Sequence, residues 1–358
     1  MKKISALLLV LVMVIAMTTA CGKKEEETTA TPTTAPVATE VPTEEVVIAA
    51  PAKTGLAVMS SIAKSKDAAA DADGLAQIDS AVVAVLVSQD GKILDCKIDA
   101  AQTKVNFSIE GKLVTDIATA YKSKQELGVD YGMLKASGIG KEWNEQADAF
   151  AAYVIGKTVD EVKGIAVNEE GAATDADLAA SVTIGLDGYI AAVEKAVANA
   201  IELGAVEGDQ LGLGLATDIA KSKDASAEGD GLAQAYSYYT TLTLNAEGKI
   251  SSIFIDASQG NVNFTTAGAV SSDLAVAPQT KQELKEGYGM LKASKIGKEW
   301  YEQANAFAVY ATGKTVDEIK GIALTEGVPA DADLAASVSV HVTSFVSTIE
   351  KAAASAVK

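Results

Sequence analysis

The feature that most constrains the fold of this chain is an internal duplication. Three segments recur without change: residues 62–68 as 219–225, residues 131–137 as 288–294, and residues 175–182 as 331–338. The offset is 157 residues (219 − 62) and shortens to 156 (331 − 175) after a loop near Glu170. A repeat of this length predicts two tandem domains of one kind, repeat 1 over residues 53–203 and repeat 2 over residues 211–358.

The start of the chain has the pattern of an exported lipoprotein. Two lysines follow the initial methionine, an apolar run covers residues 4–17, and the segment ends in Thr-Thr-Ala-Cys-Gly at residues 18–22. The run is shorter than the roughly 20 residues that span a bilayer, which is typical of a signal peptide. The small residue before Cys21 resembles a bacterial lipobox, with Thr18 where Leu is usual. We expect a lipoprotein signal peptide over residues 1–20 and an acylated Cys21 that anchors the chain to the outer face of the cytoplasmic membrane. Simple secretion is the alternative.

Residues 21–52 differ in composition from the rest of the chain. They are rich in Thr, Glu, Ala and Pro, and they hold four of the six prolines. Such a sequence buries too little apolar surface to fold. A disordered, extended spacer is therefore expected between Cys21 and repeat 1.

The acidic charge excludes some partners. The formal net charge is −18, and all 30 basic residues are lysines. We expect no nucleic-acid partner, because binding to a phosphate backbone depends on basic patches. Because Arg is absent, any phosphate group would be bound by Lys, by hydroxyls or by backbone N–H groups.

Comparison of the two copies limits the chemistry further. Cys96 corresponds to Ile253, and the single His341 corresponds to Gly185. A mechanism shared by both domains therefore needs no His or Cys, which excludes Ser-His-Asp and Cys-His catalysis and most zinc sites. Cys96 is expected to be a small buried hydrophobe rather than a redox thiol. The acidic segment 71–74 resembles a calcium loop but lacks the closing Glu, so an ordinary turn and no metal site are expected.

Each copy is expected to be α+β, with a small, mainly antiparallel sheet covered by helices. In repeat 1, two β-branched runs at residues 80–87 and 93–98 flank an Asp-Gly pair and predict a hairpin, followed by a shorter strand near residues 105–107. The matching hairpin of repeat 2 covers residues 239–244 and 250–255.

One amphipathic helix is expected over residues 141–155. Glu142 and Glu145 on this helix are expected to face solvent. Four residues at helical spacing form the face expected to be buried: Trp143, Ala147, Phe150 and Val154.

Two further helices are expected. A capping box at residues 158–161 begins a short helix that Gly164 ends. A last helix covers residues 187–203, and its equivalent covers residues 344–357.

Three motifs resemble the FMN-binding domain of Gram-positive extracellular electron-transfer lipoproteins. They are Tyr-Gly-Met at residues 131–133, Gly-Lys-Glu-Trp-x-Glu-Gln-Ala at residues 140–147, and Thr-Asp-Ala at residues 174–176, which leads to Ser-Val-Thr-Ile at residues 181–184. The lipobox, the spacer and the tandem domains are similar too. The likeness covers the second half of each copy well and the first half loosely.

The resemblance implies a covalent cofactor. In that family a transferase joins the FMN phosphate to a Thr or Ser hydroxyl in a motif close to Ser/Asp-Gly-Ala-Thr/Ser. The attachment positions here would be Thr183 and Ser339. Ser181 and Ser337 stand where the motif has glycine, and a Val follows each. The β-branched run at residues 181–184 also predicts a strand.

Aromatic side chains are candidates for a flavin pocket. Trp143 and Trp300 would stack on an isoalloxazine ring, and Tyr131 and Tyr288 would line the pocket. For each of them, packing in the core is the alternative. The flavin would carry the redox chemistry, so no catalytic side chain is expected.

Two functions remain open. The first is an extracellular electron-transfer relay whose domains hold FMN, or another flavin or quinone-type ligand, and accept electrons from a membrane redox donor. The second is a non-catalytic binding or structural lipoprotein that keeps the scaffold without the cofactor. Both describe a carrier or binding protein rather than a hydrolase or transferase.

Overall fold

The computed structural model describes residues 49–357, so the expected signal peptide, Cys21 and the spacer up to residue 48 lie outside the described residues. Within residues 49–357 the chain is α+β, as predicted: each repeat contributes a three-stranded antiparallel sheet and a set of helices. No helix in this range is both long and apolar enough to cross a membrane.

The two sheets have the same strand order. The first is ordered β1-β2-β3 and the second β4-β5-β6, so the long middle strand of each repeat is central. The bounds are β1 Ala52–Ser61, β2 Gly74–Ser88, β3 Ile93–Phe107, β4 Gln210–Asp218, β5 Gly231–Leu244 and β6 Ile250–Phe264.

The predicted hairpins are confirmed. β2 pairs with β3, and β5 with β6, in antiparallel register. Gly91 and Gly248 have φ angles of 86° and 73°, the left-handed backbone that tight hairpin turns favour. The separate strand expected near residues 105–107 is the end of β3, which continues unbroken to Phe107. The edge strands β1 and β4 were not among the expected elements.

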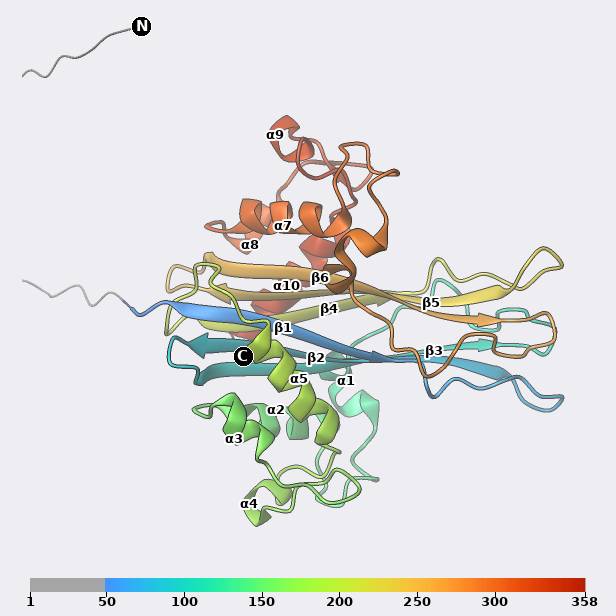
Figure 1. Cartoon of the computed structure of the whole chain (residues 1–358), viewed down its shortest axis with the longest axis horizontal. Helices are drawn as coiled ribbons and strands as arrows, with labels where there is room; N and C mark the ends of the chain where they lie inside the picture. The colour runs from blue at the N-terminus through green and yellow to red at the C-terminus, as the bar shows by residue number, and fades with distance from the viewer. Residues whose placement is uncertain (1–48, 358) are drawn as a thin grey trace, which may run out of the picture. The chain divides into compact units, whose positions relative to one another are not determined.

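Helices cover the outer face of each sheet (Figure 1). In repeat 1 they are α1 Lys124–Leu127, the 3-10 helix η1 Gly128–Tyr131, α2 Trp143–Val154, α3 Val159–Lys163, α4 Ala176–Ala179 and α5 Asp187–Ala198. In repeat 2 they are α6 Lys281–Leu284, η2 Lys285–Tyr288, α7 Trp300–Ala311, α8 Val316–Lys320, α9 Ala332–Ala335 and α10 Thr343–Ala356, with a small hairpin of β7 Leu324–Thr325 and β8 Val328–Pro329.

The helix predictions are confirmed in kind and nearly in extent. The four residues expected on the inner face of α2 are all buried. The Thr158 hydroxyl accepts a hydrogen bond from the Glu161 N–H at the start of α3, and Gly164 ends that helix. The last helix of repeat 1 is shorter than expected. It ends at Ala198, and the chain beyond it turns to pair with β1 at Ile201.

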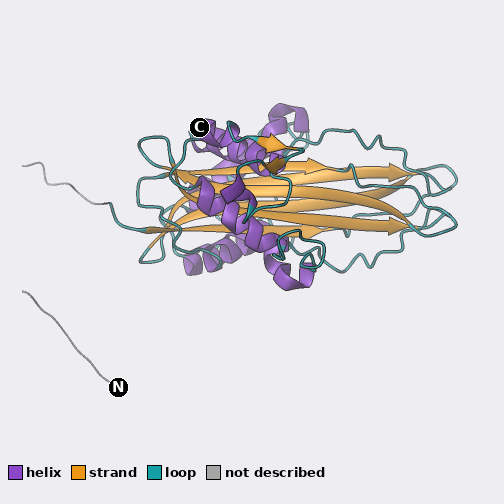
Figure 2. Cartoon of the chain, turned by 90° about the horizontal axis from the view of Figure 1, so that it is seen from above, coloured by secondary structure: helices purple, strands orange, loops and turns teal. Residues whose placement is uncertain are grey.

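The inner faces of the two sheets pack against each other. Figure 2 shows their strands running in nearly the same direction, as in an aligned sheet sandwich. One apolar cluster between them joins Leu56 and Val82 of repeat 1 to Leu213 and Tyr239 of repeat 2. A second cluster centres on Phe107 and Phe264, whose rings stack 4.2 Å apart. The layers are therefore helices, sheet, sheet, helices, with a core that both repeats share.

The identical segments 62–68 and 219–225 hold the two repeats together. Asp67 accepts a hydrogen bond from the Val270 N–H at 2.7 Å, and Asp224 accepts one from the Leu113 N–H at 2.8 Å. Each bond crosses from one repeat to the other. The two copies of this segment therefore make equivalent, reciprocal contacts across the interface between the repeats.

The last helix of each repeat packs directly against an edge strand, β1 or β4. A Cβ added to Gly55 of β1 would lie 2.0 Å from the Ala196 carbonyl oxygen of α5. One added to Gly212 of β4 would lie 2.0 Å from the Ala352 carbonyl oxygen of α10. Only glycine permits this approach, because any side chain would force the helix away from the sheet.

This packing gives a first prediction. Gly212→Ala should lower the free energy of unfolding by about 1–3 kcal/mol, because α10 must move outward. Gly188→Ala on α5 is the control, since no atom lies within 4 Å of the added Cβ. Urea denaturation followed by circular dichroism measures both. Equal stability of the two variants would contradict the close packing.

Candidate functional site

The two expected attachment hydroxyls lie in the loop that precedes the last helix of each repeat. Thr183 is exposed and Ser339 is half-buried. In repeat 1, the side-chain oxygen of Gln146 accepts hydrogen bonds from the Thr183 N–H at 2.7 Å, the Thr183 hydroxyl at 3.1 Å and the Ile184 N–H at 3.1 Å. We call this arrangement the glutamine latch.

Repeat 2 has the same latch. The Gln303 side-chain oxygen accepts from the Ser339 N–H at 2.8 Å, the Ser339 hydroxyl at 3.2 Å and the Val340 N–H at 3.2 Å. Both glutamines are fully buried. Their amide nitrogens donate to Ser137 and Ser294, respectively, at 3.0 and 3.1 Å. The latch therefore joins segments from the three motifs that carry the family resemblance, at residues 131–137, 140–147 and 181–184.

The prediction that Glu142 faces solvent is wrong. Glu142 is only 4% exposed. Its carboxylate accepts hydrogen bonds from the Met133 N–H at 2.8 Å and the Leu134 N–H at 3.1 Å. Burial of the carboxylate is tolerated because backbone donors satisfy it. Glu145 is exposed, as expected, and its carboxylate caps the Glu142 N–H at 2.8 Å.

The predicted strand at residues 181–184 is wrong. This segment is irregular, because its N–H groups at Thr183 and Ile184 bond to a side chain rather than to a neighbouring strand. The valine after each expected glycine position is buried in the core. Ser181 and Ser337 are half-buried. Ser337 lines a shallow hollow of about 480 Å³ beside α7 and α9, whose lining residues do not include Ser339.

The aromatic candidates do come together, but each pair surrounds a lysine that sequence analysis did not single out. In repeat 1 the Lys124 ammonium lies 4.4 Å from the Tyr131 ring centre and 5.1 Å from that of Trp143. Trp143 is 2% exposed, so the expected alternative of core packing is confirmed for it. The Lys124 ammonium makes a cation–π contact with the Trp143 ring.

Repeat 2 encloses its lysine more completely. The Lys281 ammonium lies 4.2, 5.0 and 4.4 Å from the ring centres of Tyr288, Trp300 and Tyr236. Lys281 and Trp300 are 2% and 3% exposed. Burial lowers the pKa of Lys281 to about 7, and the nearby Asp256 carboxylate opposes this shift. Tyr236 has no aromatic equivalent in repeat 1, where Asp79 takes its place.

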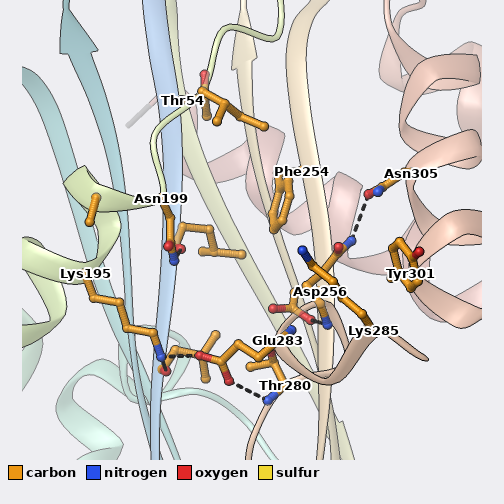
Figure 3. Close-up of a pocket in the computed structure, with 15 residues that line it drawn as sticks. Thr54, Lys195, Asn199, Phe254, Asp256, Thr280, Glu283, Lys285, Tyr301 and Asn305 are labelled. Carbon is orange, nitrogen blue, oxygen red and sulfur yellow. Dashed lines mark hydrogen bonds and ion pairs between the residues drawn. The ribbon is translucent and has the colours of Figure 1, made fainter. Parts of the chain in front are cut away.

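Two further grooves lie between the repeats. The first inter-repeat groove has a volume of about 630 Å³ and the second about 360 Å³. The first groove is bordered by β1 and α5 of repeat 1 and by β6, α6 and α7 of repeat 2 (Figure 3). The second groove uses the corresponding elements with the repeats exchanged. Lys195 pairs with Glu283 in the first groove, and Lys351 pairs with Glu126 at 2.7 Å as the twofold-related contact.

A buried carboxylate lies on the floor of each groove. Asp256 accepts hydrogen bonds from the Ala257 N–H at 2.7 Å and the Gln282 N–H at 3.0 Å, which fixes the start of α6. Burial raises the pKa of Asp256 to about 7 and that of its equivalent, Asp99, to about 6. Sequence analysis missed both, although an Asp in the same Ile-Asp-Ala stretch of each copy was the available signal.

Cys96 is buried, as expected, and burial raises its pKa. Within residues 49–357, no group of three or more His, Cys, Asp or Glu side chains is placed to hold a metal ion. Comparison of the chain with protein-family models, curated proteins and solved structures finds no match. Function is therefore inferred from the residues of this chain alone.

The latch predicts a stability effect. Gln146→Ala leaves three donors without their acceptor, so the free energy of unfolding should fall by about 2–4 kcal/mol. Gln89→Ala, at an exposed glutamine, is the control and should change it by less than about 0.5 kcal/mol. Urea denaturation measures both. A Gln146→Ala variant as stable as the control would show that the latch contributes nothing.

The buried lysine predicts a pH dependence. The pKa of Lys281 in the folded state, about 7, lies well below that of an unfolded lysine. As the pH rises above about 7, the folded state therefore loses the Lys281 proton while the unfolded state keeps it. The contribution of Lys281 to stability should therefore increase from about pH 7 to about pH 10, and Lys281→Met should remove this increase. Denaturation of both proteins at pH 7, 8 and 9 measures the difference. Parallel pH profiles of the two proteins would contradict a lowered pKa at Lys281.

Proposed function

We propose that this chain is a non-catalytic binding protein of the cell surface. Acylated Cys21 would anchor it to the outer face of the cytoplasmic membrane, and the spacer would hold the folded part away from the lipid. The two repeats would act as one body with a shared core rather than as two separate cofactor carriers.

The glutamine latch is the observation that carries this proposal. Covalent attachment of FMN needs a free hydroxyl and donors for the phosphate. Here the Thr183 and Ser339 hydroxyls bond to buried Gln146 and Gln303, and the two N–H groups beside each hydroxyl bond to the same oxygen. A phosphate would have to displace these bonds and leave a buried amide oxygen unpaired, which costs free energy.

The missing glycine supports the same conclusion. A bulky phosphate approaches a backbone most easily at glycine. Val182 and Val338, in the motif's Ala position, are 1% and 0% exposed, so they anchor the loop in the core. Ser181 and Ser337, where glycine would stand, carry side chains that are half-buried.

The flavin relay is the second candidate, and the exposure of Thr183 favours it. The Thr183 hydroxyl lies near solvent, so a transferase would reach it if the latch opened. Ser339 is less accessible than Thr183, so a relay with one flavin on repeat 1 is the form this exposure supports.

One experiment separates the two candidates. The chain is coexpressed with a flavin transferase, and its intact mass and visible absorbance are measured. We expect an unmodified mass and no flavin absorbance. A flavin acceptor protein with an intact attachment motif, coexpressed in parallel, shows that the transferase is active. An FMN adduct that disappears in Thr183→Ala or Ser339→Ala would overturn the proposal and establish the relay.

A further inference from the structure

The two inter-repeat grooves are related by the duplication, yet their lining has diverged. Phe254 and Tyr301 line the first groove, and Lys97 and Asn144 hold the equivalent positions of repeat 1. The first groove is also the larger, at about 630 Å³ against about 360 Å³. Because the backbones correspond, the second groove serves as a reference for what the fold alone requires. The aromatic rings are additions beyond that requirement.

Lys285 is the most informative of these differences. It lines the first groove, and its φ and ψ angles are 48° and −119°. Gly128 occupies the equivalent position with nearly the same angles, 49° and −120°. This backbone conformation suits glycine and strains a residue with a side chain. Repeat 2 therefore carries a lysine where the fold favours glycine, and strain of this kind points to a role for the side chain.

The Lys285 ammonium has no partner among the described residues, whereas the nearby carboxylates do. Asp256 accepts from backbone N–H groups, and Glu283 pairs with Lys195 and accepts from the Thr280 N–H at 2.8 Å. Glu286 accepts from the Tyr301 hydroxyl at 2.8 Å. The charge of the groove that has no ion-pair partner among the described residues is thus the exposed Lys285 ammonium, within a chain whose net charge is −18.

The rest of the lining suits a ring-shaped ligand. In Figure 3 the Lys285 side chain lies among Phe254, Asp256 and Tyr301, so an ammonium and two aromatic rings border one space. The Asn305 side-chain oxygen accepts from Gln282 at 2.8 Å, and its amide N–H₂ makes no hydrogen bond within residues 49–357. That group is a second free donor in the groove. The volume lies within the roughly 300–1,000 Å³ of small-molecule sites.

We propose that the first inter-repeat groove binds a small aromatic carboxylate. The carboxylate pairs with the Lys285 ammonium and accepts from the Asn305 amide, while the ring packs against Phe254 and Tyr301. A neutral saccharide would use the rings but would not need Lys285. The inference rests on the proposed function, since it gives that binding protein a ligand class and a site.

Isothermal titration of the whole chain tests the proposal, with benzoate and 4-hydroxybenzoate as probes. We expect one site per chain. Lys285→Gly should weaken benzoate binding about tenfold to a hundredfold, the effect of losing a charged hydrogen-bond partner. The same variant should melt at an equal or higher temperature, because glycine relieves the backbone strain. Loss of binding would then not reflect unfolding.

Matched controls make the test specific. Phe254→Ala should weaken binding, whereas Lys97→Ala, at the equivalent position of the second groove, should leave it unchanged. Benzamide, which has the same shape without the charge, should bind more weakly and should not respond to Lys285→Gly.

Three results would overturn the inference: no binding of either carboxylate, equal affinity of Lys285→Gly and the wild type, or equal affinity for benzamide and benzoate. Covalent flavin at Thr183 or Ser339 would overturn the proposed function and leave this titration unaffected, so the two failures are distinguishable.

Discussion

The packing of one sheet against the other is the interaction on which the rest of the structure depends. Each repeat covers the outer face of its sheet with its own helices, and among the residues that the structure describes it is the other repeat that buries the largely apolar inner face. Leu56 and Val82 meet Leu213 and Tyr239 there, and the rings of Phe107 and Phe264 stack. Two copies are therefore a physical requirement, because one sheet alone would expose its hydrophobic face to water.

The same packing explains why particular segments recur unchanged. Asp67 and Asp224 each accept a hydrogen bond from a backbone N–H of the opposite repeat, so a substitution that removes the side-chain oxygen would lose a cross-repeat bond. The other recurring motifs meet at the glutamine latch, where buried Gln146 links the loop of Ser137 to the loop of Thr183. The residues that resemble a cofactor attachment sequence thus form a hydrogen-bonded scaffold between two loops.

Divergence between the copies underlies the ligand site that we propose. The recurring residues Asp67, Asp224, Ser137 and Gln146 make hydrogen bonds within the fold. In the first inter-repeat groove the copies differ, because repeat 2 contributes two aromatic rings and the Lys285 ammonium, which has no partner among residues 49–357. Lys285 also has backbone angles that suit glycine. Natural proteins concentrate such strain at functional sites, because packing elsewhere supplies the stability that the site gives up.

The sequence by itself determined the duplication, the α+β class, the hairpins and the buried face of α2, because each of these depends on local periodicity, turn residues or capping boxes. It did not indicate β1 and β4, whose glycines leave room for a helix that packs on them from elsewhere in the chain. It placed Glu142 in solvent and made a strand of residues 181–184, since a buried carboxylate or amide can be recognised only with its distant partners in view. Tertiary structure alone decided that the two sheets stack and where the grooves between the repeats lie. Both depend on contacts between residues more than a hundred positions apart, such as the 2.7 Å pair of Lys351 and Glu126, and no local pattern encodes such contacts.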